Sequence, residues 1–313
     1  MNPLRRAVID VGTNSVKLLV AEVADGRITP LHEEGRQTRL GRGFYETRQL
    51  QPEPLRDTAA AVAAFAAKAR EFDAAPPRVI ATSAARDAVN AAELLAAIHA
   101  SSGLVVEVIS GEQEACWAFA GACTQPALAA QPMLLLDTGG GSSEFIVGGG
   151  GQSHFRQSYP LGAVRLAESL PHGDPPAAED LARCRQQLRE FLAREVVPAV
   201  RPALDREPAS VALVATGGTA SVLAMMQLGL PRFDRERIEA VALDAAQVAD
   251  WTARLWKLPL AERRQITGLP PERADIILFG VAILEAVMDS FQFSPLHVST
   301  RGLRFGALLA SLR

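Results

Sequence analysis

Two short segments of the chain place an aspartate and several small residues directly after an apolar run. The first follows Ile9 and reads Asp10-Val11-Gly12-Thr13-Asn14-Ser15, and the second follows Leu136 and reads Asp137-Thr138-Gly139-Gly140-Gly141-Ser142-Ser143-Glu144. Small residues let backbone N–H groups approach an anion closely. An aspartate in the same turn suits a hard cation such as Mg²⁺. Two such turns facing each other would form a clamp for phosphate and metal.

Each of these turns could instead be a simple tight connection between two strands. An ordinary hairpin needs no aspartate before its glycines and no Ser-Ser-Glu after them. The repetition of the pattern therefore favours phosphate binding over a plain turn. A third small-residue turn, Thr216-Gly217-Gly218-Thr219, joins a predicted strand to a predicted helix. It either binds an anion at the helix N-terminus or is a plain connection with Thr219 as N-cap, and the sequence does not choose.

A pair of glutamates, Glu112 and Glu114, opens the predicted helix 111–122. Acidic residues in a first helical turn commonly interact with the helix dipole. A carboxylate there could also orient and deprotonate a water that attacks phosphorus. The spacing alone does not select Glu114 over Glu112.

Arginines near the turns are candidates for holding phosphate oxygens, because a planar guanidinium suits them. Arg36, Arg39 and Arg42 lie in a Gly-bearing loop, and Arg86 follows Thr82-Ser83 at the end of a predicted strand. The five histidines have no metal-binding spacing, so we assign them no role.

Composition excludes several classes of protein. With 48% apolar residues, 21% charged residues and a net charge of −3, the chain has no global basic field for nucleic acid or an anionic membrane. No stretch has the length and character of a signal peptide or a membrane span. The three cysteines lack metal-ligand spacing, and we expect Cys116 and Cys123 to be small buried residues in a protein of the reducing cytoplasm.

The pattern of strands and helices restarts after Gln125. Strand triplets at the start of each half, each followed by alternating helices and strands, predict an α/β protein with two domains of like topology. We expect the domains to span 1–125, joined by a final helix within 302–313, and 126–301. A hinge is expected near 124–131, and the cleft between such domains is the natural ligand site. A long helix is predicted over 178–196.

These motifs together resemble the exopolyphosphatase/guanosine pentaphosphate phosphatase family, in a short form. The family belongs to the actin-like, sugar-kinase and Hsp70 ATPase superfamily. Besides the three glycine turns, the resemblance is carried by Thr82-Ser83-Ala84-Ala85-Arg86, Ser110-Gly111-Glu112-Gln113-Glu114-Ala115, Arg273-Ala274-Asp275 and Gly302-Leu303-Arg304. It implies two duplicated actin-like (ribonuclease H-like) domains with an interdomain cleft. It also implies an enzyme that uses Mg²⁺ to remove terminal phosphate from inorganic polyphosphate, guanosine pentaphosphate or both.

The resemblance also implies roles for individual residues. Glu114 matches the catalytic glutamate, and Asp137 and Glu144 match an acidic pair that holds metal and orients water, with Asp10 as a further metal ligand. The substrate-binding positions it implies are Asn14, Ser15, Arg39, Arg86, Gly139, Gly140, Gly141, Ser142, Gly217 and Gly218. Phe305 stands where an acidic residue is usual. Family members are often dimers, so a homodimer is expected as well.

Two other functions stay open at this point. An ATP-using kinase or ATPase of the same superfamily would have its nucleotide site around 216–219. The second alternative is a protein that binds guanosine polyphosphates without hydrolysing them. The presence of Glu114, Asp137 and Glu144 argues against an inactive protein.

Overall fold

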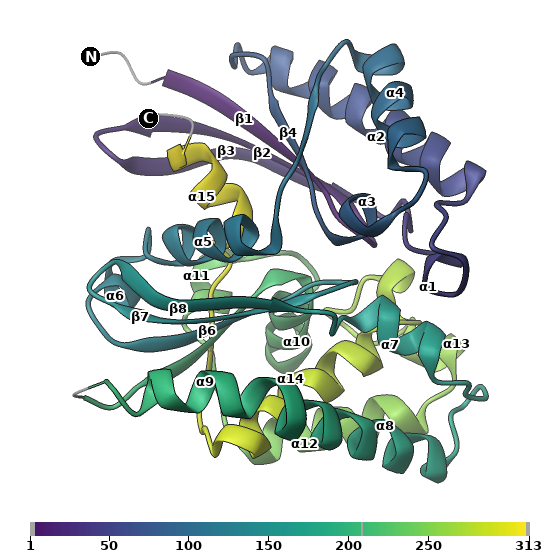
Figure 1. Ribbon diagram of the computed structural model, residues 1–313, viewed down its shortest axis with the longest axis vertical. Helices are drawn as coiled ribbons and strands as arrows, with labels where there is room; N and C mark the ends of the chain where they lie inside the picture. The colour runs from purple at the N-terminus through teal and green to yellow at the C-terminus, as the bar shows by residue number, and fades with distance from the viewer. Residues whose placement is uncertain (1–3, 208, 311–313) are drawn as a thin grey trace. The chain divides into compact units, whose positions relative to one another are not determined.

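The computed structural model describes residues 4–207 and 209–310, and the chain folds into two compact units. The first unit contains 1–125 and 301–313, and the second contains 126–300. Each unit is built around one mixed β-sheet, and Figure 1 shows the elements of both.

The sheet of the first unit has the order β3-β2-β1-β4-β5. The first three strands form an antiparallel meander, while β4 and β5 run parallel to β1. The first small-residue turn is the connection between β1 and β2. The strands are β1 (Leu4–Val11), β2 (Val16–Ala24), β3 (Arg27–Arg36), β4 (Arg78–Ala81) and β5 (Val106–Val108).

Helices cover both faces of this sheet, because its strands alternate apolar side chains between two cores. Ile9 and Leu18 belong to the core beneath α2 (Pro52–Glu71) and α4 (Ala91–Ser102), which pack on each other (Figure 1). Val8 and Leu19 face the core shared with Trp117 of α5 (Gly111–Ala122) and Phe305 of α15 (Leu303–Ala310). Two short helices, α1 (Phe44–Thr47) and α3 (Ser83–Asp87), complete the unit.

The sheet of the second unit repeats this arrangement. Its order, β8-β7-β6-β9-β11-β10, again starts with an antiparallel meander, followed by β9 and β11 parallel to β6. The second small-residue turn joins β6 to β7, at the place that the first turn has in its own sheet. The strands are β6 (Met133–Thr138), β7 (Ser143–Gly149), β8 (Gln152–Tyr159), β9 (Ala212–Thr216), β10 (Ala242–Leu243) and β11 (Leu296–Val298).

The core of the second unit is centred on α14 (Ile277–Phe291), which is apolar nearly all round and therefore buried. Its one buried acid, Glu285, forms a bidentate ion pair with Arg185 at 2.6 and 3.0 Å. The other helices are α6 (Pro126–Ala129), α7 (Ala163–Ser169), α8 (Ala178–Phe191), α9 (Val197–Leu204), α10 (Gly217–Leu228), α11 (Arg235–Glu239), α12 (Ala245–Lys257) and α13 (Leu260–Arg263).

Two expectations about local structure need correction. The predicted helix over 178–196 is helical throughout, but its regular part, α8, is interrupted after Phe191 by a π-helical turn, Leu192–Val196, that leads into α9. Pro198 explains the interruption, since proline has no N–H to continue the regular ladder. Cys116 is exposed rather than buried, because it lies one turn after the exposed Glu112 on the outer face of α5, and Cys123 is only partly buried.

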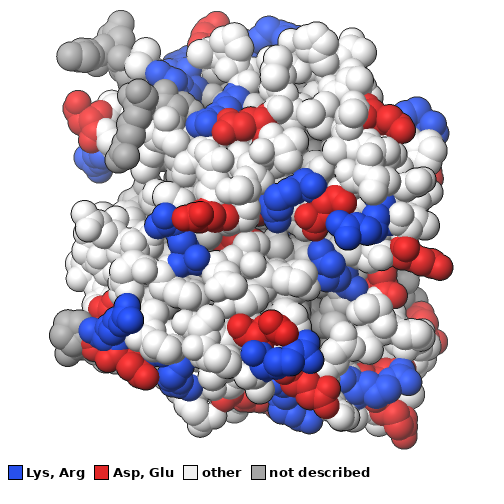
Figure 2. Space-filling model, in the orientation of Figure 1, with Lys and Arg blue, Asp and Glu red and all other residues white. Residues whose placement is uncertain are grey.

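The surface carries both signs of charge. On the face drawn in Figure 2, acidic and basic side chains of the described residues are interspersed without a broad area of either sign. None of the helices within 4–207 and 209–310 combines the length and the hydropathy that a membrane crossing requires.

Candidate active site

The turn between β1 and β2 is fixed by hydrogen bonds on two sides. Within it, the N–H of Gly12 donates to the carbonyl of Ser15 at 3.0 Å. From outside, the N–H groups of Arg39 and Gly41 donate to the carbonyls of Asn14 and Thr13 at 3.0 and 2.7 Å. These carbonyls are thus committed to the loop 39–41, which favours the approach of an anion to the N–H side of the turn.

Arg39 differs from the two arginines that flank it in sequence. Arg36 pairs with Glu34, and Arg42 pairs with Glu53. Each of these four side chains is at least 30% exposed. Arg39 instead has a left-handed backbone, with φ of 52°, and its N–H is bonded to the turn at Asn14. The structure therefore places Arg39 beside the first turn, as its candidate role requires.

Asp10 ends β1 and is buried, with only 8% of its surface exposed. The strand register puts it beside Lys17 and Ile80, on the face of the sheet that α5 and α15 cover. Within the described part of the chain its Oδ1 atom has no hydrogen-bond partner. Burial raises the pKa of Asp10, and the charges of Lys17 and Arg304 oppose that rise. A buried carboxylate oxygen of this kind is suited to an external cation.

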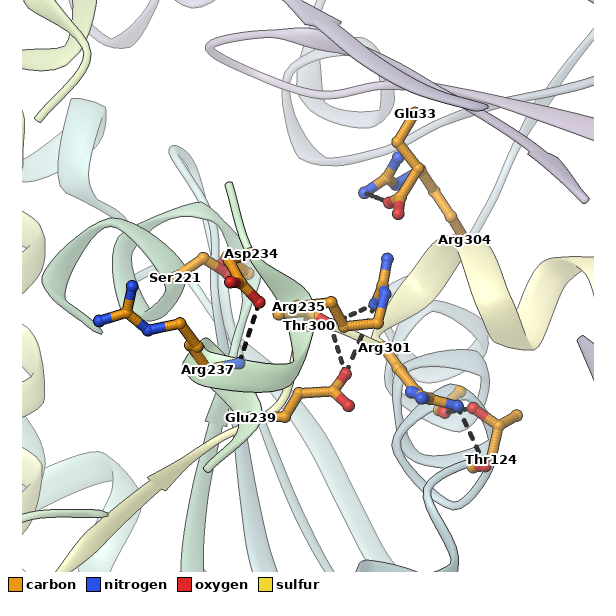
Figure 3. Close-up of polar contacts among 12 residues, drawn as sticks. Glu33, Thr124, Ser221, Asp234, Arg235, Arg237, Glu239, Thr300, Arg301 and Arg304 are labelled. Carbon is orange, nitrogen blue, oxygen red and sulfur yellow. Dashed lines mark hydrogen bonds and ion pairs between the residues drawn. The ribbon is translucent and has the colours of Figure 1, made fainter. Parts of the chain in front are cut away.

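Arg304 holds its place beside this carboxylate through two other contacts. Its guanidinium donates to the carbonyl of Leu18 at 2.8 Å and pairs with Glu33 at 3.1 Å (Figure 3). The next residue, Phe305, is completely buried in the core between α15 and the sheet, and Arg301 lies over its ring. Phe305 is thus a core residue, and Arg304 is the residue of this segment whose charge acts on Asp10.

The two glutamates of α5 are clearly separated by the structure. Ser110 caps the helix by accepting a hydrogen bond from the N–H of Gln113, and this sets the direction of the first turn. Glu114 is 8% exposed and accepts a hydrogen bond from Arg86, whereas Glu112 is exposed. Burial and a fixed cationic partner favour Glu114 as the functional carboxylate.

The turn between β6 and β7 repeats the geometry of the first. The N–H of Gly139 donates to the carbonyl of Ser142 at 2.9 Å, as Gly12 does to Ser15. The carbonyls of Gly139 and Gly140 accept from the first N–H groups of α7, at 2.9 to 3.1 Å. The N–H groups of Gly140 and Gly141 have no backbone acceptor among the residues described here. This turn therefore offers adjacent N–H groups to an anion.

Asp137, Glu144 and Thr216 lie in one row across three strands. Asp137 of β6 is opposite Glu144 of β7 on one side and opposite Thr216 of β9 on the other. Glu144 is 1% exposed and accepts a hydrogen bond from Ser158 at 2.7 Å. The row brings two carboxylates together directly beside the glycine turn.

The third turn lies against the same row. Helix α10 begins at Gly217, so Thr219 lies inside the first turn and the N-cap position belongs to Thr216. The alternative of a plain connection placed Thr219 at the N-cap, and that assignment is wrong because the chain already turns at Gly217, whose φ is 93°. A Cβ at Gly217 would lie 2.8 Å from Asp137 Oδ1, so glycine is needed for Asp137 to keep its place.

Arg273 is a site residue that sequence reasoning left without a role. Its guanidinium packs on Gly218, where an added Cβ would lie only 2.1 Å from Nη1. Burial lowers the pKa of Arg273, and Glu272 opposes that shift. The signal that could have found it was the need for a glycine as the second residue of α10, which implies close approach by another group.

The candidate site residues therefore form two groups, one in each unit. The first unit brings together Asp10, Asn14, Ser15 and Arg39, and separately pairs Arg86 with Glu114. The second unit brings together Asp137, Glu144, Thr216, Gly217, Gly218 and the turn 139–142.

A metal ion fits these groups by the chemistry of their donors. No cluster of three or more His, Cys, Asp or Glu side chains suited to a metal occurs in the part of the chain that the structure describes. Mg²⁺ does not need one, since it is usually held by one or two carboxylates together with phosphate and water. The adjacent carboxylates of Asp137 and Glu144 in the second unit meet that requirement, and the Oδ1 atom of Asp10 is a candidate metal ligand within the first unit.

Comparison with known protein families gives a match over most of the chain. The model of the Ppx/GppA phosphatase family matches residues 19–313, beginning in β2. Exopolyphosphatase 2 of Mycobacterium tuberculosis is 33% identical over 296 residues, which cover 90% of this chain and 89% of that protein. Exopolyphosphatase 1 of Mycobacterium bovis is 27% identical over 310 residues, covering 99% and 88%.

Solved structures agree with this match. The Ppx/GppA family member of Aquifex aeolicus has a TM-score of 0.79 at 30% identity, covering 99% of this chain and 97% of that one. An exopolyphosphatase from Cytophaga hutchinsonii has a TM-score of 0.87 at 26% identity, covering 98% and 97%. Together with the repeated sheets, these likenesses confirm the predicted α/β fold class with two duplicated actin-like domains.

Proposed function

Because the chain belongs to the Ppx/GppA phosphatase family, we propose that it is an exopolyphosphatase that releases terminal orthophosphate from inorganic polyphosphate with the help of Mg²⁺. The observation that carries the proposal is the row of Asp137 and Glu144 beside a turn with adjacent backbone N–H groups. Carboxylates that hold a cation next to N–H groups that bind an anion are the parts that phosphoanhydride hydrolysis requires.

In this proposal the two small-residue turns bind the terminal phosphates. Backbone N–H groups of the turn 139–142, together with Asn14 and Ser15 in the first turn, are the donors. Gly217 and Gly218 bind a phosphate at the N-terminus of α10 in this proposal, where the helix dipole favours an anion and the guanidinium of Arg273 packs on Gly218. Arg39, held at the first turn, binds a further phosphate of the chain.

Asp137, Glu144 and Asp10 are the proposed ligands of Mg²⁺. When bound, the ion neutralises negative charge on the phosphate oxygens. The carboxylates of Asp137 and Glu144 also orient the attacking water, and Ser158 holds Glu144 in place by donating a hydrogen bond to it.

Glu114 is the proposed general base. It takes a proton from a water molecule while the water oxygen forms a bond to the terminal phosphorus. The bridging P–O bond breaks, and its electron pair leaves with the oxygen of the shortened chain. The two products are the shortened chain and orthophosphate. Removal of a positioned base typically costs about 10² to 10⁴ in rate.

Guanosine pentaphosphate is the second candidate substrate, because its terminal phosphoanhydride presents the same reacting group to the same turns. We further propose a cytoplasmic location, supported by the three free thiols. The two compact units support actin-like domains at 1–125 with 302–313 and at 126–301. A homodimer is a separate expectation, which the mass of the protein in solution tests.

The proposal is tested by measuring orthophosphate release from polyphosphate, guanosine pentaphosphate and ATP at matched Mg²⁺. Turnover of polyphosphate that EDTA abolishes is the expected result. Turnover of ATP alone would instead indicate a kinase-like or ATPase activity. Tight binding of guanosine tetraphosphate without turnover of any substrate would indicate a binding protein.

A further inference from the structure

Arg86 joins the two ends of the motif that carries Glu114. Its Nη1 atom donates one hydrogen bond to Glu114 Oε2 at 3.3 Å and another to the carbonyl of Ile109 at 3.1 Å. Ile109 directly precedes the helix cap Ser110, and Glu114 lies on the helix that this cap begins. One nitrogen atom therefore ties the start of α5 to the carboxylate that α5 presents.

The backbone of Arg86 is also held in place by the fold. Its backbone N–H donates to the carbonyl of Thr82, and its Nε lies 3.9 Å from the carboxylate of Asp87. Thr82 in turn donates its N–H to the carbonyl of Val11, at the end of β1. The backbone of Arg86 is thus anchored through Thr82 to the end of β1, where the first turn begins.

The burial of the two side chains makes the contact between Arg86 and Glu114 important. The side chain of Glu114 is 10% exposed and that of Arg86 is 25% exposed. A carboxylate so far removed from water depends on its cationic partner much more than one on the surface does. A glutamate side chain also has several rotatable bonds, so a partner that holds it reduces the orientations that it samples.

We propose that Arg86 is a positioning residue that orients the Glu114 carboxylate for the attack of water, and that it acts on the rate through Glu114 rather than by gripping the substrate. This inference rests on the proposed function, since it takes Glu114 as the base. It gives Arg86 a different task from Arg39, whose backbone is bonded to the phosphate-binding turn itself.

The two roles for Arg86 predict different kinetics. A residue that binds the phosphate chain equally in ground and transition states changes mainly KM. A residue that orients the base changes kcat and leaves KM nearly unchanged. Residues that act as one unit are also non-additive, so loss of Arg86 should matter little once Glu114 has lost its carboxylate.

The test compares Arg86→Gln, Glu114→Gln and the double variant in orthophosphate release from polyphosphate with Mg²⁺. We expect Arg86→Gln to lower kcat roughly 10- to 100-fold, with KM within about twofold of wild type. In the Glu114→Gln background, adding Arg86→Gln should change the residual kcat less than about twofold. Arg86→Lys should recover part of kcat, since it keeps the charge but not the planar geometry.

Arg48→Gln is the matched control. Arg48 is exposed and donates to the carbonyl of Asp87, one residue from Arg86, so the control removes the same charge from the same neighbourhood. We expect its kcat and KM to stay within about twofold of wild type. Thermal unfolding of the same variants measures the contact without any substrate. Arg86→Gln should unfold at a lower temperature than wild type, and the double variant should lose less than the two single losses added together.

Three results would overturn the inference. A higher KM for Arg86→Gln with unchanged kcat would assign Arg86 to the phosphate chain. Equal losses in the presence and absence of the Glu114 carboxylate would show that Arg86 does not act through it. A wild-type enzyme that releases no orthophosphate would refute the proposed function and this inference together, whereas the first two results leave the proposed function standing.

Discussion

Asp137 and Glu144 are direct cross-strand partners in the β6–β7 ladder. Two like charges in such a pair are destabilising unless something neutralises them. The equivalent position in the first unit differs, because Asp10 of β1 is opposite Lys17 of β2. The Lys17 side chain therefore lies beside the aspartate of the first turn, whereas the second turn has two carboxylates side by side. We infer that this difference suits the second turn to an external metal ion.

This relationship predicts how Mg²⁺ changes stability. Binding to the native state at about 100 times Kd should add roughly 2.7 kcal/mol to the free energy of unfolding. Asp137→Asn should abolish most of that gain, because it removes one of the proposed metal ligands. Thermal unfolding in Mg²⁺ and in EDTA measures the gain in each variant. Asp250→Asn, an exposed change on α12, is the control, and an undiminished Mg²⁺ effect in Asp137→Asn would remove Asp137 from the metal site.

Alanine substitutions at Gly217 and Gly229 distinguish the effect of backbone strain from the effect of displacing a site residue. They lie at the two ends of α10, with φ of 93° and 60°, so alanine is strained at both. Each alanine should cost on the order of 1 kcal/mol in stability. Only at Gly217 would the new Cβ meet the carboxylate of Asp137, because nothing lies within 4 Å at Gly229.

We therefore expect Gly217→Ala to lower kcat roughly 100-fold, since a displacement of about 1 Å in a catalytic group has an effect of that size. Gly229→Ala should keep near wild-type kcat despite a similar loss in thermal stability. If both variants retain full activity, the position of Asp137 does not matter to the reaction.

The cysteines predict an order of reactivity with a thiol reagent at mildly alkaline pH. The thiolate is the reactive form, so a raised pKa slows the reaction at any pH below it. Burial raises the pKa of Cys123 to about 11, and burial, with a contribution from Glu285, raises that of Cys184 to about 12. Cys116 is exposed and should react first. Ellman's reagent should modify one thiol quickly in the native protein and three after unfolding, and Cys116→Ser should remove the fast phase. Fast modification of Cys184 in the native protein would contradict its burial.

Much of the fold could be predicted because its signals are local. The boundaries of α5 were predicted without error, since an apolar run and small turn residues lie next to one another in the sequence. The turns at Asp10 and Asp137 were predictable as a pair from their repeated composition. Their equivalent hydrogen bonds, Gly12 to Ser15 and Gly139 to Ser142, confirm that they are copies of one structure.

What the sequence could not provide depends on contacts between distant segments. Glu112 and Glu114 are two residues apart, and only the packing of α5 against α15 and the sheet buries one and exposes the other. The same packing turns Cys116 outward and buries Phe305. Likewise, the bond from Arg86 to Glu114 and the packing of Arg273 on Gly218 join segments that no local pattern relates.

Glu114 is the proposed base of a phosphohydrolase, and the neighbouring Glu112 is the reference against which its role is measured. Orthophosphate release from polyphosphate is measured at saturating substrate and Mg²⁺ for wild type, Glu114→Ala and Glu112→Ala. We expect Glu114→Ala to lower kcat about 10²- to 10⁴-fold, while Glu112→Ala stays close to wild type. Near wild-type turnover by Glu114→Ala, or an equal loss in both variants, would contradict it.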